Sequence, residues 1–374
     1  MFTANNWTPS GVPGTATDCE IGNGYSVPRM SGTFNCQNTK FQSSGSINWN
    51  NSTNNYRIYG AWTVESGFTY TNSNNAIVDL RGAGDQAVTL NSTTFPNDLR
   101  VNNTGGTVTF EDTGTIAGDL TLSNGDIRIA NGASLTVQGD ITVASGSTFD
   151  IDPGGTLILG NGSTLTVSSG GTLELVGNFA NSSTIQAVNN ASSYTVTINN
   201  GATISAQYYT LKNLGATGLT INATSNIDAT NFLQNGTFTY PGVNSANLLR
   251  LFQEIPGDTL DGMSFDSDGS TATSVISVFT STGATADTLD MTNYSGDMTG
   301  ATFTNDTNYL VNWSSETNEL KLTQESTAPA SSNQGDIVDM GTFGFQQLNA
   351  GSFNDTDITY IRVTLTGTGS SSDV

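Results

Sequence analysis

Hydrophobic and polar residues alternate in short groups along most of the chain, and between residues 131 and 176 the alternation becomes a regular repeat. Gly146, Gly154, Gly162 and Gly170 recur every eight residues, and each precedes a triplet in which two apolar residues flank a variable one. The apolar pairs are Phe149/Ile151, Leu157/Leu159, Leu165/Val167 and Leu173/Leu175. Alternation with a period of two predicts β-strands with one buried face, and the Gly, Ser and Asn residues between the triplets supply turns.

Strands this short cannot bury their apolar face alone, so successive units must stack on one another. Antiparallel hairpins would give a meander or a barrel, whereas a parallel β-helix would place three eight-residue units in each coil of about 24 residues. Small turn residues at equivalent places suit corners that stack, and strands of this length would make weak isolated hairpins. The pattern therefore predicts an all-β chain that forms a parallel β-helix, with three short strands in each coil of about 22–24 residues.

The coil length predicts which side chains become vertical neighbours. The expected inward columns are Ile127/Phe149/Leu173, Ile129/Ile151/Leu175, Leu135/Leu157 and Ile141/Leu165. Arg128, Asp150 and Glu174 form an outward column in which successive rungs are ~4.8 Å apart. We therefore expect Arg128 to pair with Asp150, and Asp150 and Glu174 to repel one another mildly.

Less regular triplets continue on both sides of the repeat and predict a solenoid over residues 1–325, with an N-terminal cap region at residues 1–40. One segment, residues 244–255, departs from the strand pattern and is predicted to be a short helix capped by Ser245. Its apolar residues with helical spacing are Leu248, Leu251, Phe252 and Ile255.

The last part of the chain has a different organisation. Residues 326–336 (STAPASSNQGD) are predicted to be a linker because they are rich in turn-forming residues. Residues 337–374 begin a new series of strands that is too short for a complete sandwich of ~100 residues. We therefore expect an incomplete β-sandwich segment and a chain that is part of a longer protein.

Composition and charge narrow the function. The chain has 374 residues, with 10 Lys and Arg against 32 Asp and Glu and a formal net charge of −22, which argues against binding to nucleic acid or anionic membranes. The absence of histidine excludes Ser–His and Cys–His nucleophiles and zinc-hydrolase motifs. No apolar run approaches the ~18–20 residues of a membrane span, so membrane insertion is not expected. No signal peptide is visible at the start, although the acidic, Asn- and Thr-rich composition suits an extracellular protein.

The two cysteines, Cys19 and Cys36, have two interpretations. If both occupy one lateral position on successive coils, their α-carbons come within the ~4.4–6.8 Å of a disulfide. Such a bridge stabilises the chain by about 3 kcal/mol in the chain-entropy model and fits an exported protein. Otherwise they are two buried free thiols.

The aromatic-rich stretch between residues 49 and 70 also has two interpretations. Tyr56, Tyr59 and Trp62 either pack in the core near the first coils or form an exposed platform for stacking on sugars.

Several segments carry a resemblance to a known class of proteins. FTANNWTPSGVP (2–13), the coil-like run at 84–129, the eight-residue repeats, and VNWSSETNELKLT (311–323) resemble bacterial surface and adhesin-type right-handed parallel β-helix repeat proteins, similar to autotransporter passengers. The last ~45 residues resemble the opening of an extracellular β-sandwich found in similar proteins. The resemblance implies an exported, surface-attached or secreted passenger, and it transfers no functional residue.

The main enzymatic alternative is a polysaccharide lyase or hydrolase, since many carbohydrate-active enzymes share this fold. The ten basic residues are scattered, and only Arg57 and Arg81, which are 24 residues apart, suggest a common face. Asp150 and Asp152 lie on one face of a predicted strand, as paired catalytic carboxylates or as solvated acids. We expect solvated acids.

A second acidic segment suggests a metal site only in part. Asp266 and Asp268 in FDSDGS resemble the start of a calcium loop, but Ser277 stands where the loop glutamate belongs, so a turn is expected. We assign no catalytic residue, metal ligand or cofactor from the sequence.

The sequence therefore predicts a non-enzymatic structural or adhesive module of a large exported cell-surface protein, a stiff spacer or binding surface. The alternative is a carbohydrate-active β-helix enzyme or a carbohydrate-binding module. The expected partners are surface glycans or neighbouring repeats of the same protein, in an extracellular location.

Overall fold

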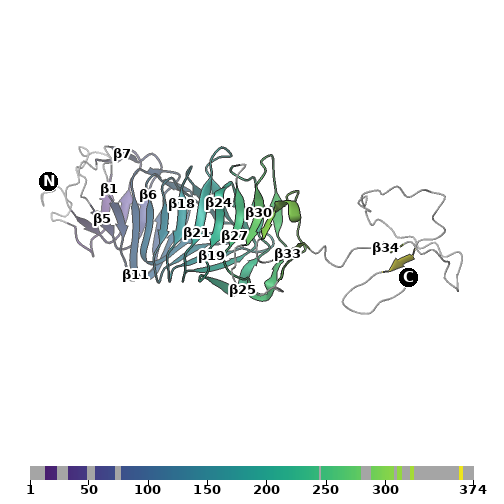
Figure 1. The fold of residues 1–374 in the computed structure, drawn as a ribbon. Coiled ribbons are helices and arrows are strands. Elements are labelled where there is room, and N and C mark those ends of the chain that lie inside the picture. Colours follow the sequence, from purple (N-terminus) through teal and green to yellow (C-terminus); the bar gives the residue numbers. More distant parts are fainter. Residues whose placement is uncertain are drawn as a thin grey trace. The chain divides into compact units, whose positions relative to one another are not determined.

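The computed structural model describes residues 13–22, 33–48, 55–71, 77–243, 246–278, 288–306, 310–313, 321–323 and 362–364. Contacts divide the chain into two units, Met1–Ser314 and Ser315–Val374. The first unit is a parallel β-helix of about 11 turns whose strands stack along one axis (Figure 1). The predicted fold class is confirmed.

The strands of the solenoid form three faces, each a ladder of parallel strands. The first face runs through β2 (Phe34–Cys36), β5 (Asn55–Ile58), β8 (Ile77–Leu80), the start of β11 (Leu99–Phe110), the start of β13 (Leu120–Ile129), β15 (Ile141–Val143), β18 (Thr164–Val167), β21 (Tyr194–Ile198), β24 (Leu214–Ile221), β27 (Asn247–Leu251), β30 (Ser274–Val278) and β32 (Thr304–Asp306). Parallel pairing at every step means that each coil adds one rung to this face.

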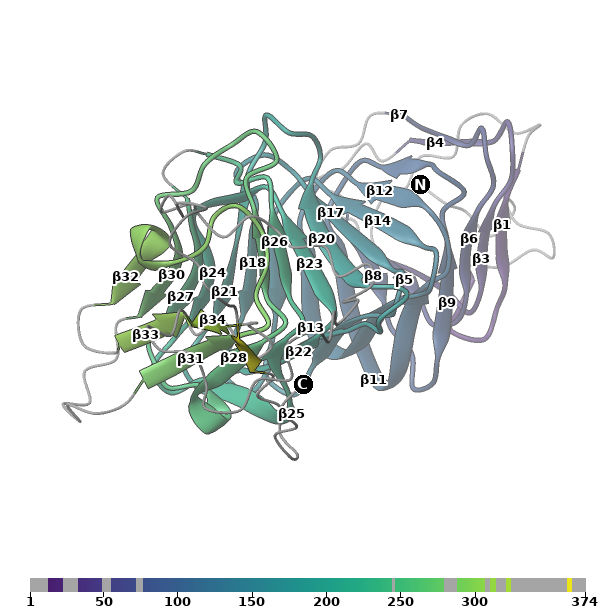
Figure 2. The same ribbon diagram turned by 90° about the vertical axis from the view of Figure 1, so that its right-hand side faces the viewer.

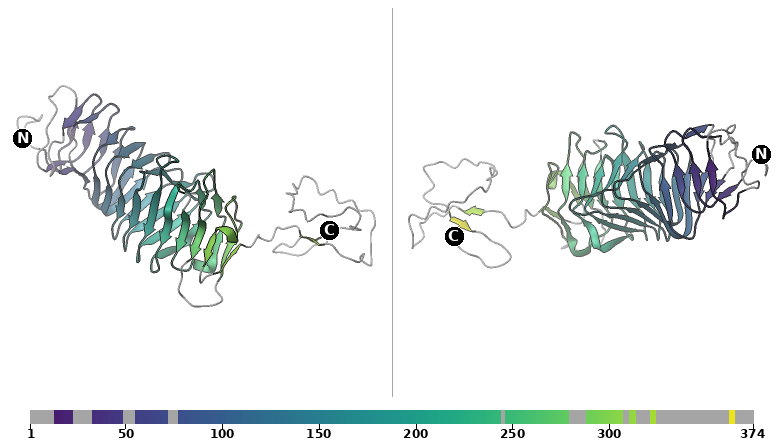
Figure 3. Two further views of the ribbon diagram at one scale, coloured as in Figure 1. Left: turned by 45° about the horizontal axis from the view of Figure 1, so that its top comes forward. Right: turned by 180° about the vertical axis from the view of Figure 1, so that it is seen from behind.

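The second and third faces follow the same rule. The second face contains β1 (Cys19–Ile21), β3 (Thr39–Phe41), β6 (Trp62–Val64), β9 (Gln86–Thr89), the ends of β11 and β13, β16 (Thr148–Ile151), β19 (Thr172–Val176), β22 (Thr203–Gln207) and β25 (Asn226–Gln234). The third face contains β10 (Thr94–Phe95), β12 (Gly114–Ile116), β14 (Ser134–Val137), β17 (Thr156–Leu159), β20 (Ser183–Ala187), β23 (Tyr209–Lys212), β26 (Thr237–Thr239) and β29 (Ser264–Asp266). Figure 2 shows β12, β14, β17, β20 and β23 side by side, and Figure 3 shows the stack from two further sides.

Smaller elements complete the described part. β4 (Ser46–Asn48) pairs in parallel with β7 (Thr69–Thr71), and β31 (Thr288–Thr292) lies between β28 (Thr259–Asp261) and β33 (Leu310–Trp313). The described helical residues form two 3₁₀ turns, η2 (Pro256–Asp258) and η3 (Ala301–Phe303).

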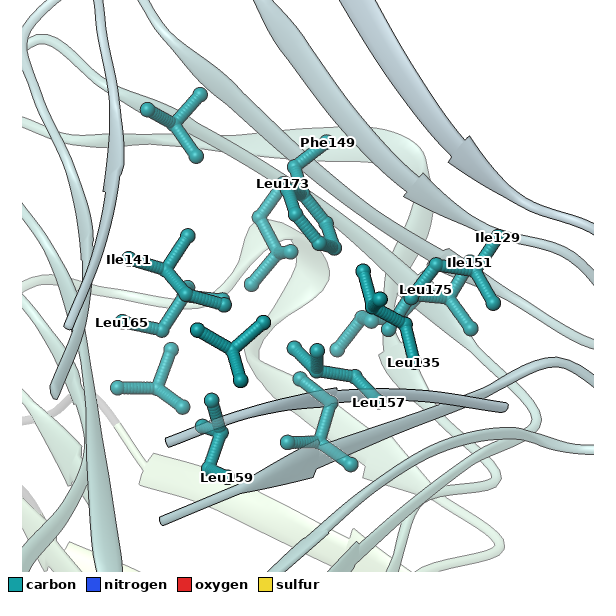
Figure 4. Close-up of a cluster of buried hydrophobic side chains, with 14 of the residues drawn as sticks. Ile129, Leu135, Ile141, Phe149, Ile151, Leu157, Leu159, Leu165, Leu173 and Leu175 are labelled. Atoms are coloured by element: carbon teal, nitrogen blue, oxygen red, sulfur yellow. The ribbon is translucent and has the colours of Figure 1, made fainter. Parts of the chain in front are cut away.

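The predicted register is confirmed in the regular coils. Phe149 pairs with both Ile127 and Leu173, and Ile151 pairs with Ile129. The other predicted columns also pair, as Leu135 with Leu157 and Ile141 with Leu165. These side chains have no exposed surface and fill the interior of the coil (Figure 4). Burying an aliphatic side chain contributes about 1.5–3 kcal/mol, so these columns are the main source of stability.

The glycines of the eight-residue repeat are required by backbone conformation. Gly146 and Gly162 have φ of 77° and 79°, in the left-handed region that side chains disfavour. A Cβ at either position would meet no atom within 4 Å. Glycine is therefore required at these corners by the positive φ of the turn and not by a lack of room for a side chain.

The helix predicted over residues 244–255 is wrong. Residues Asn247–Leu251 form β27, whose Leu249 pairs with Leu219 on one side and with Ile276 on the other. Leu248 and Leu249 are both buried, so the inward–outward alternation fails here and the apolar spacing imitates a helix. Ladder hydrogen bonds and burial in the stack outweigh this local pattern. Residues 244–245 lie outside the described part of the chain.

The second unit contains β34 (Lys321–Thr323), which pairs antiparallel with β35 (Arg362–Thr364). The sequence places residues 320–323 at the end of the solenoid, whereas contacts assign everything from Ser315 onward to the second unit. Residues 326–336 and most of 337–374 lie outside the described residues, so the linker and the β-sandwich segment stay predictions. Within the described residues, no helix has the length and hydropathy needed to cross a bilayer.

Candidate functional site

Cys19 and Cys36 form a disulfide with α-carbons 5.8 Å apart. The sequence suggested one shared lateral position for the two cysteines. Instead, Cys19 of β1 stacks on Thr39 of β3. Cys36 ends β2 on the first face, just before the corner that leads to Thr39. The bridge therefore joins adjacent faces of neighbouring coils.

The proposed sugar-stacking platform is wrong for two of its three aromatic residues. Tyr56 and Trp62 are 1% and 0% exposed, so no sugar can reach their rings. Tyr56 lies in contact with Phe34, at a ring-centroid distance of 5.2 Å, and Trp62 meets Phe95 edge-on at 5.4 Å. Only Tyr59 is partly exposed. Packing in the core explains the aromatic-rich stretch apart from this residue.

A cluster of arginines lies beside Tyr59 on the first face. Arg57, Asp79 and Arg100 occupy one outward column on the successive strands β5, β8 and β11. Arg81 follows two residues after Asp79, at the matching position to Tyr59 on the next rung, because Ile58 pairs with Leu80. We call Arg57, Tyr59, Arg81 and Arg100 the basic patch.

One carboxylate holds the basic patch together. Asp79 is fully buried although its column faces outward. It accepts hydrogen bonds from Arg81 Nε at 2.6 Å and from Arg100 Nη2 at 2.7 Å and Nε at 3.2 Å. These contacts raise the pKa of Arg100, chiefly through the hydrogen bond to Asp79. A buried carboxylate with several charge-assisted hydrogen bonds is the expected way to enclose such a charge.

The second face carries a hollow of about 350 Å³ with the opposite charge. Its lining residues are Thr107, Asp126, Ile127, Arg128, Thr148, Asp150, Asp152 and Glu174. They come from four successive rungs, on β11, β13, β16 and β19, and from the corner after β16. We call this feature the acidic hollow.

The expected pairing of Arg128 with Asp150 is wrong. The two residues are register neighbours, but Arg128 reaches diagonally to Asp152, with Nε–Oδ1 at 2.8 Å and Nη2–Oδ2 at 2.7 Å. A guanidinium matches a carboxylate through two parallel hydrogen bonds, which the position of Asp152 allows. Asp152 is thereby largely buried, so it is not the freely solvated acid that the sequence suggested.

Asp150 has no ion pair with Arg128, and the acids Asp152 and Glu174 lie near it. Burial, followed by repulsion from Glu174 and Asp152, raises the pKa of Asp150 to about 7. The predicted repulsion between Asp150 and Glu174 is present, and it adds to the larger effect of burial on the pKa of Asp150. A carboxyl group that holds a proton near neutral pH can donate hydrogen bonds or protons.

The FDSDGS segment forms a turn after β29, as expected. The amide of Asp268 donates to Asp266 Oδ1 at 3.3 Å, and the amide of Ser267 donates to Asp297 Oδ1 at 2.7 Å. Hydrogen bonds from Ser267 lower the pKa of Asp297. Within the described residues no group of three or more Cys, Asp or Glu side chains is placed to hold a metal ion.

Sequence reasoning missed the basic patch. It noticed Arg57 and Arg81 but overlooked Asp79 and Arg100, which share the column of Arg57. The separations of 22 and 21 residues along Arg57, Asp79 and Arg100 match the coil length. Extending the coil length upstream of the regular repeat would have found the cluster.

These features define the chain as an all-β parallel solenoid with two compact charge clusters on its outer faces. A scan against protein-family models and a search of curated proteins find no match. Among solved structures, the chain is similar to a crystal structure of a TibC-catalysed, hyper-glycosylated fragment of TibA. The sequence identity is 16%, the alignment covers 80% of this chain and 95% of that fragment, and the TM-score is 0.36. The function has to be inferred from this chain's own residues.

Proposed function

We propose that this chain is a non-enzymatic structural or adhesive module of a large exported cell-surface protein. The observation that carries the proposal is the ladder of the first face, which pairs in parallel from Phe34 in β2 to Asp306 in β32. About 11 turns at ~4.8 Å per turn give a rod of roughly 50 Å. A rod with a continuous apolar interior suits a spacer that holds a binding surface away from its attachment.

Export to an oxidising compartment is supported by the disulfide between Cys19 and Cys36. Such bridges persist outside the cytosol and are rare within it. The net charge of −22 is consistent with an exposed, soluble surface. Surface glycans and neighbouring repeats of the same protein are the partners we propose.

The chemistry of the basic patch supports binding over proton abstraction. A lyase base must lose its proton near neutral pH, which requires a lowered pKa in an arginine. Asp79 moves the pKa of Arg100 in the opposite direction. The basic patch is therefore better suited to binding anions through permanently charged arginines than to removing a proton from a substrate.

One observation favours the alternative of a glycan hydrolase. Asp150, with its pKa raised to about 7, lies beside Glu174 in the acidic hollow. A glycosidase acid needs a pKa shifted in this direction. Asp152, by contrast, is engaged by Arg128 through a hydrogen bond and an ion pair.

The two functions are separated by incubating the full chain with a panel of neutral and acidic polysaccharides. New reducing ends report hydrolysis, and unsaturated uronide products report a lyase. The structural or adhesive module predicts no products above a heat-inactivated control. Products that disappear in Asp150→Asn but persist in Asp140→Asn, an exposed acid away from the hollow, would overturn the proposal in favour of the hydrolase.

A further inference from the structure

We propose that the basic patch binds the carboxylate or sulfate group of an anionic glycan, with Tyr59 against the sugar ring. The inference deepens the proposed function, on which it rests for its biological role, by naming the binding face and the ligand class. The proposed binding is local and not a general affinity for anions, because the chain as a whole has a net charge of −22. Only a local concentration of arginines can attract a polyanion to such a protein.

The basic patch has a net positive charge. Arg57, Arg81 and Arg100 all lie within 3.8 Å of the one carboxylate of Asp79, so three positive charges face one negative charge. The nearest acids along the chain are directed elsewhere. Asp98 accepts the amide of Asp119 at 2.9 Å, and Asp85 accepts the amide of Thr107 at 3.0 Å.

The arginines also have unused hydrogen-bond donors. Arg57 Nε lies 3.8 Å from Asp79 Oδ2, too far for a hydrogen bond, and is itself buried, so any ligand contact of Arg57 has to be made by its terminal nitrogens. Arg81 uses only its Nε towards Asp79, which leaves its terminal nitrogens for a ligand. The three side chains are 28%, 31% and 31% exposed, so solvent reaches them. Guanidinium groups recognise carboxylate and sulfate oxygens through such paired donors.

Tyr59 lies at the corner next to these donors. It is the partly exposed aromatic residue of the predicted platform, one rung before Arg81. Gln86 Nε2 donates to the carbonyls of Ile58 at 3.1 Å and Gly60 at 2.8 Å, the two residues that flank Tyr59. The backbone that carries the ring is thus held in place. An amphipathic, rigid aromatic side chain beside arginines is a suitable contact for an acidic sugar.

The test measures binding of the full chain to polygalacturonate, dextran sulfate and neutral dextran by isothermal titration calorimetry at low and moderate salt. We expect binding to at least one polyanion, weakened by salt, and none to dextran. Binding to polygalacturonate identifies carboxylate as the ligand group, and binding to dextran sulfate alone identifies sulfate.

Arg57→Gln is the informative variant because Arg57 donates no hydrogen bond to Asp79 and its loss leaves the other contacts intact. It should weaken binding roughly tenfold, as expected for one charged hydrogen bond. Tyr59→Ala should weaken binding severalfold. Arg128→Gln is the matched control, since it removes the same charge at the acidic hollow, and it should change the affinity less than twofold.

Two outcomes overturn the inference: no polyanion binds, or Arg128→Gln weakens binding as much as Arg57→Gln. Circular dichroism of each variant verifies that it is folded. The same mixtures are assayed for released reducing ends. Release of reducing ends would overturn the proposed non-enzymatic function but would not contradict the proposed binding site. Failure of the proposed function and failure of the inferred binding site therefore give different results.

Discussion

The basic patch and the acidic hollow are built on the same plan with opposite results. Each contains one outward column across three successive rungs: Arg57, Asp79 and Arg100 on the first face, and Arg128, Asp150 and Glu174 on the second. In both columns an aspartate is central and an arginine precedes it. The third residue differs, an arginine beside Asp79 and a glutamate beside Asp150.

That third residue contributes to the different surroundings of the two central carboxylates. Arg100 gives Asp79 two hydrogen bonds, and the carboxylate is fully enclosed. Glu174 repels Asp150, and Arg128 turns away to Asp152, so burial and repulsion raise the pKa of Asp150 to about 7. A residue one coil away thus contributes to the electrostatics of both columns, together with burial at Asp150 and with Arg81 at Asp79.

The largest effect is expected for Asp79→Asn. The substitution leaves three arginines facing one another without their shared carboxylate, and breaking a buried charge network from one side costs about 3 kcal/mol. Urea unfolding should show this loss of stability. Glu111→Gln, at an exposed position, should stay within about 0.5 kcal/mol of the parent, and an equally small effect of Asp79→Asn would contradict the central role of this carboxylate.

A smaller loss is expected for Arg128→Gln. Asp152 loses its hydrogen bond and ion pair with Arg128, but Arg128 is 51% exposed and water partly replaces it, so the cost should be about 1–2 kcal/mol. Because Arg128 also lowers the pKa of Asp150, its removal should raise that pKa further. Thermal unfolding and NMR titration of the Asp150 carboxyl measure the two effects, and a lowered pKa would contradict the assignment.

Asp150→Asn should stabilise the protein, with a characteristic pH dependence. Because the pKa of Asp150 is raised to about 7 in the folded state, the native protein keeps a proton that the unfolded chain releases. Stability therefore falls as the pH rises from about 4 to about 7, and the full cost is present above pH 7. After allowance for solvent screening, the variant should gain about 1–2 kcal/mol at pH 8 and almost nothing at pH 4. A gain that is the same at both pH values would show that the effect is not electrostatic.

The smallest expected effect extends the basic column. Thr121 is the register partner of Arg100 on the next rung, so Thr121→Asp places a carboxylate beside the patch and should stabilise the fold by about 0.5 kcal/mol. The same change should weaken polyanion binding. Thr142→Asp, one rung farther along the column, serves as the control, and equal weakening by both variants would argue against a localised site.

The fold was predictable where the pattern is strictly periodic. Phe149 and Leu173 could be placed one above the other because eight-residue units repeat without insertions between them. The prediction failed at Leu248 and Leu249, where two consecutive buried residues obscure the period of two. For the cysteines the predicted disulfide is confirmed, but the two residues lie on adjacent faces and not at one lateral position, since a corner between faces cannot be located where the coil length varies.

The candidate sites were harder to predict because they depend on side-chain direction. The register correctly placed Arg128 opposite Asp150, but the reach of a long side chain to Asp152 is decided by the geometry of the corner. Tyr56 and Tyr59 are three residues apart and chemically alike, yet only Tyr59 is accessible. Tyr56 points inward from β5, whereas Tyr59 lies at the corner after that strand.

The sequence by itself determined the all-β class, the stacking of short parallel strands and the inward columns of the regular coils, because local alternation and a constant repeat length are properties of the chain alone. Only the tertiary structure decided which charges meet, namely the three arginines at Asp79 and the diagonal pair of Arg128 and Asp152. The reason is physical. Burial of apolar residues needs only the correct face of a strand, whereas a hydrogen bond between charged groups needs atoms within about 3 Å, a distance set by every coil and corner between them.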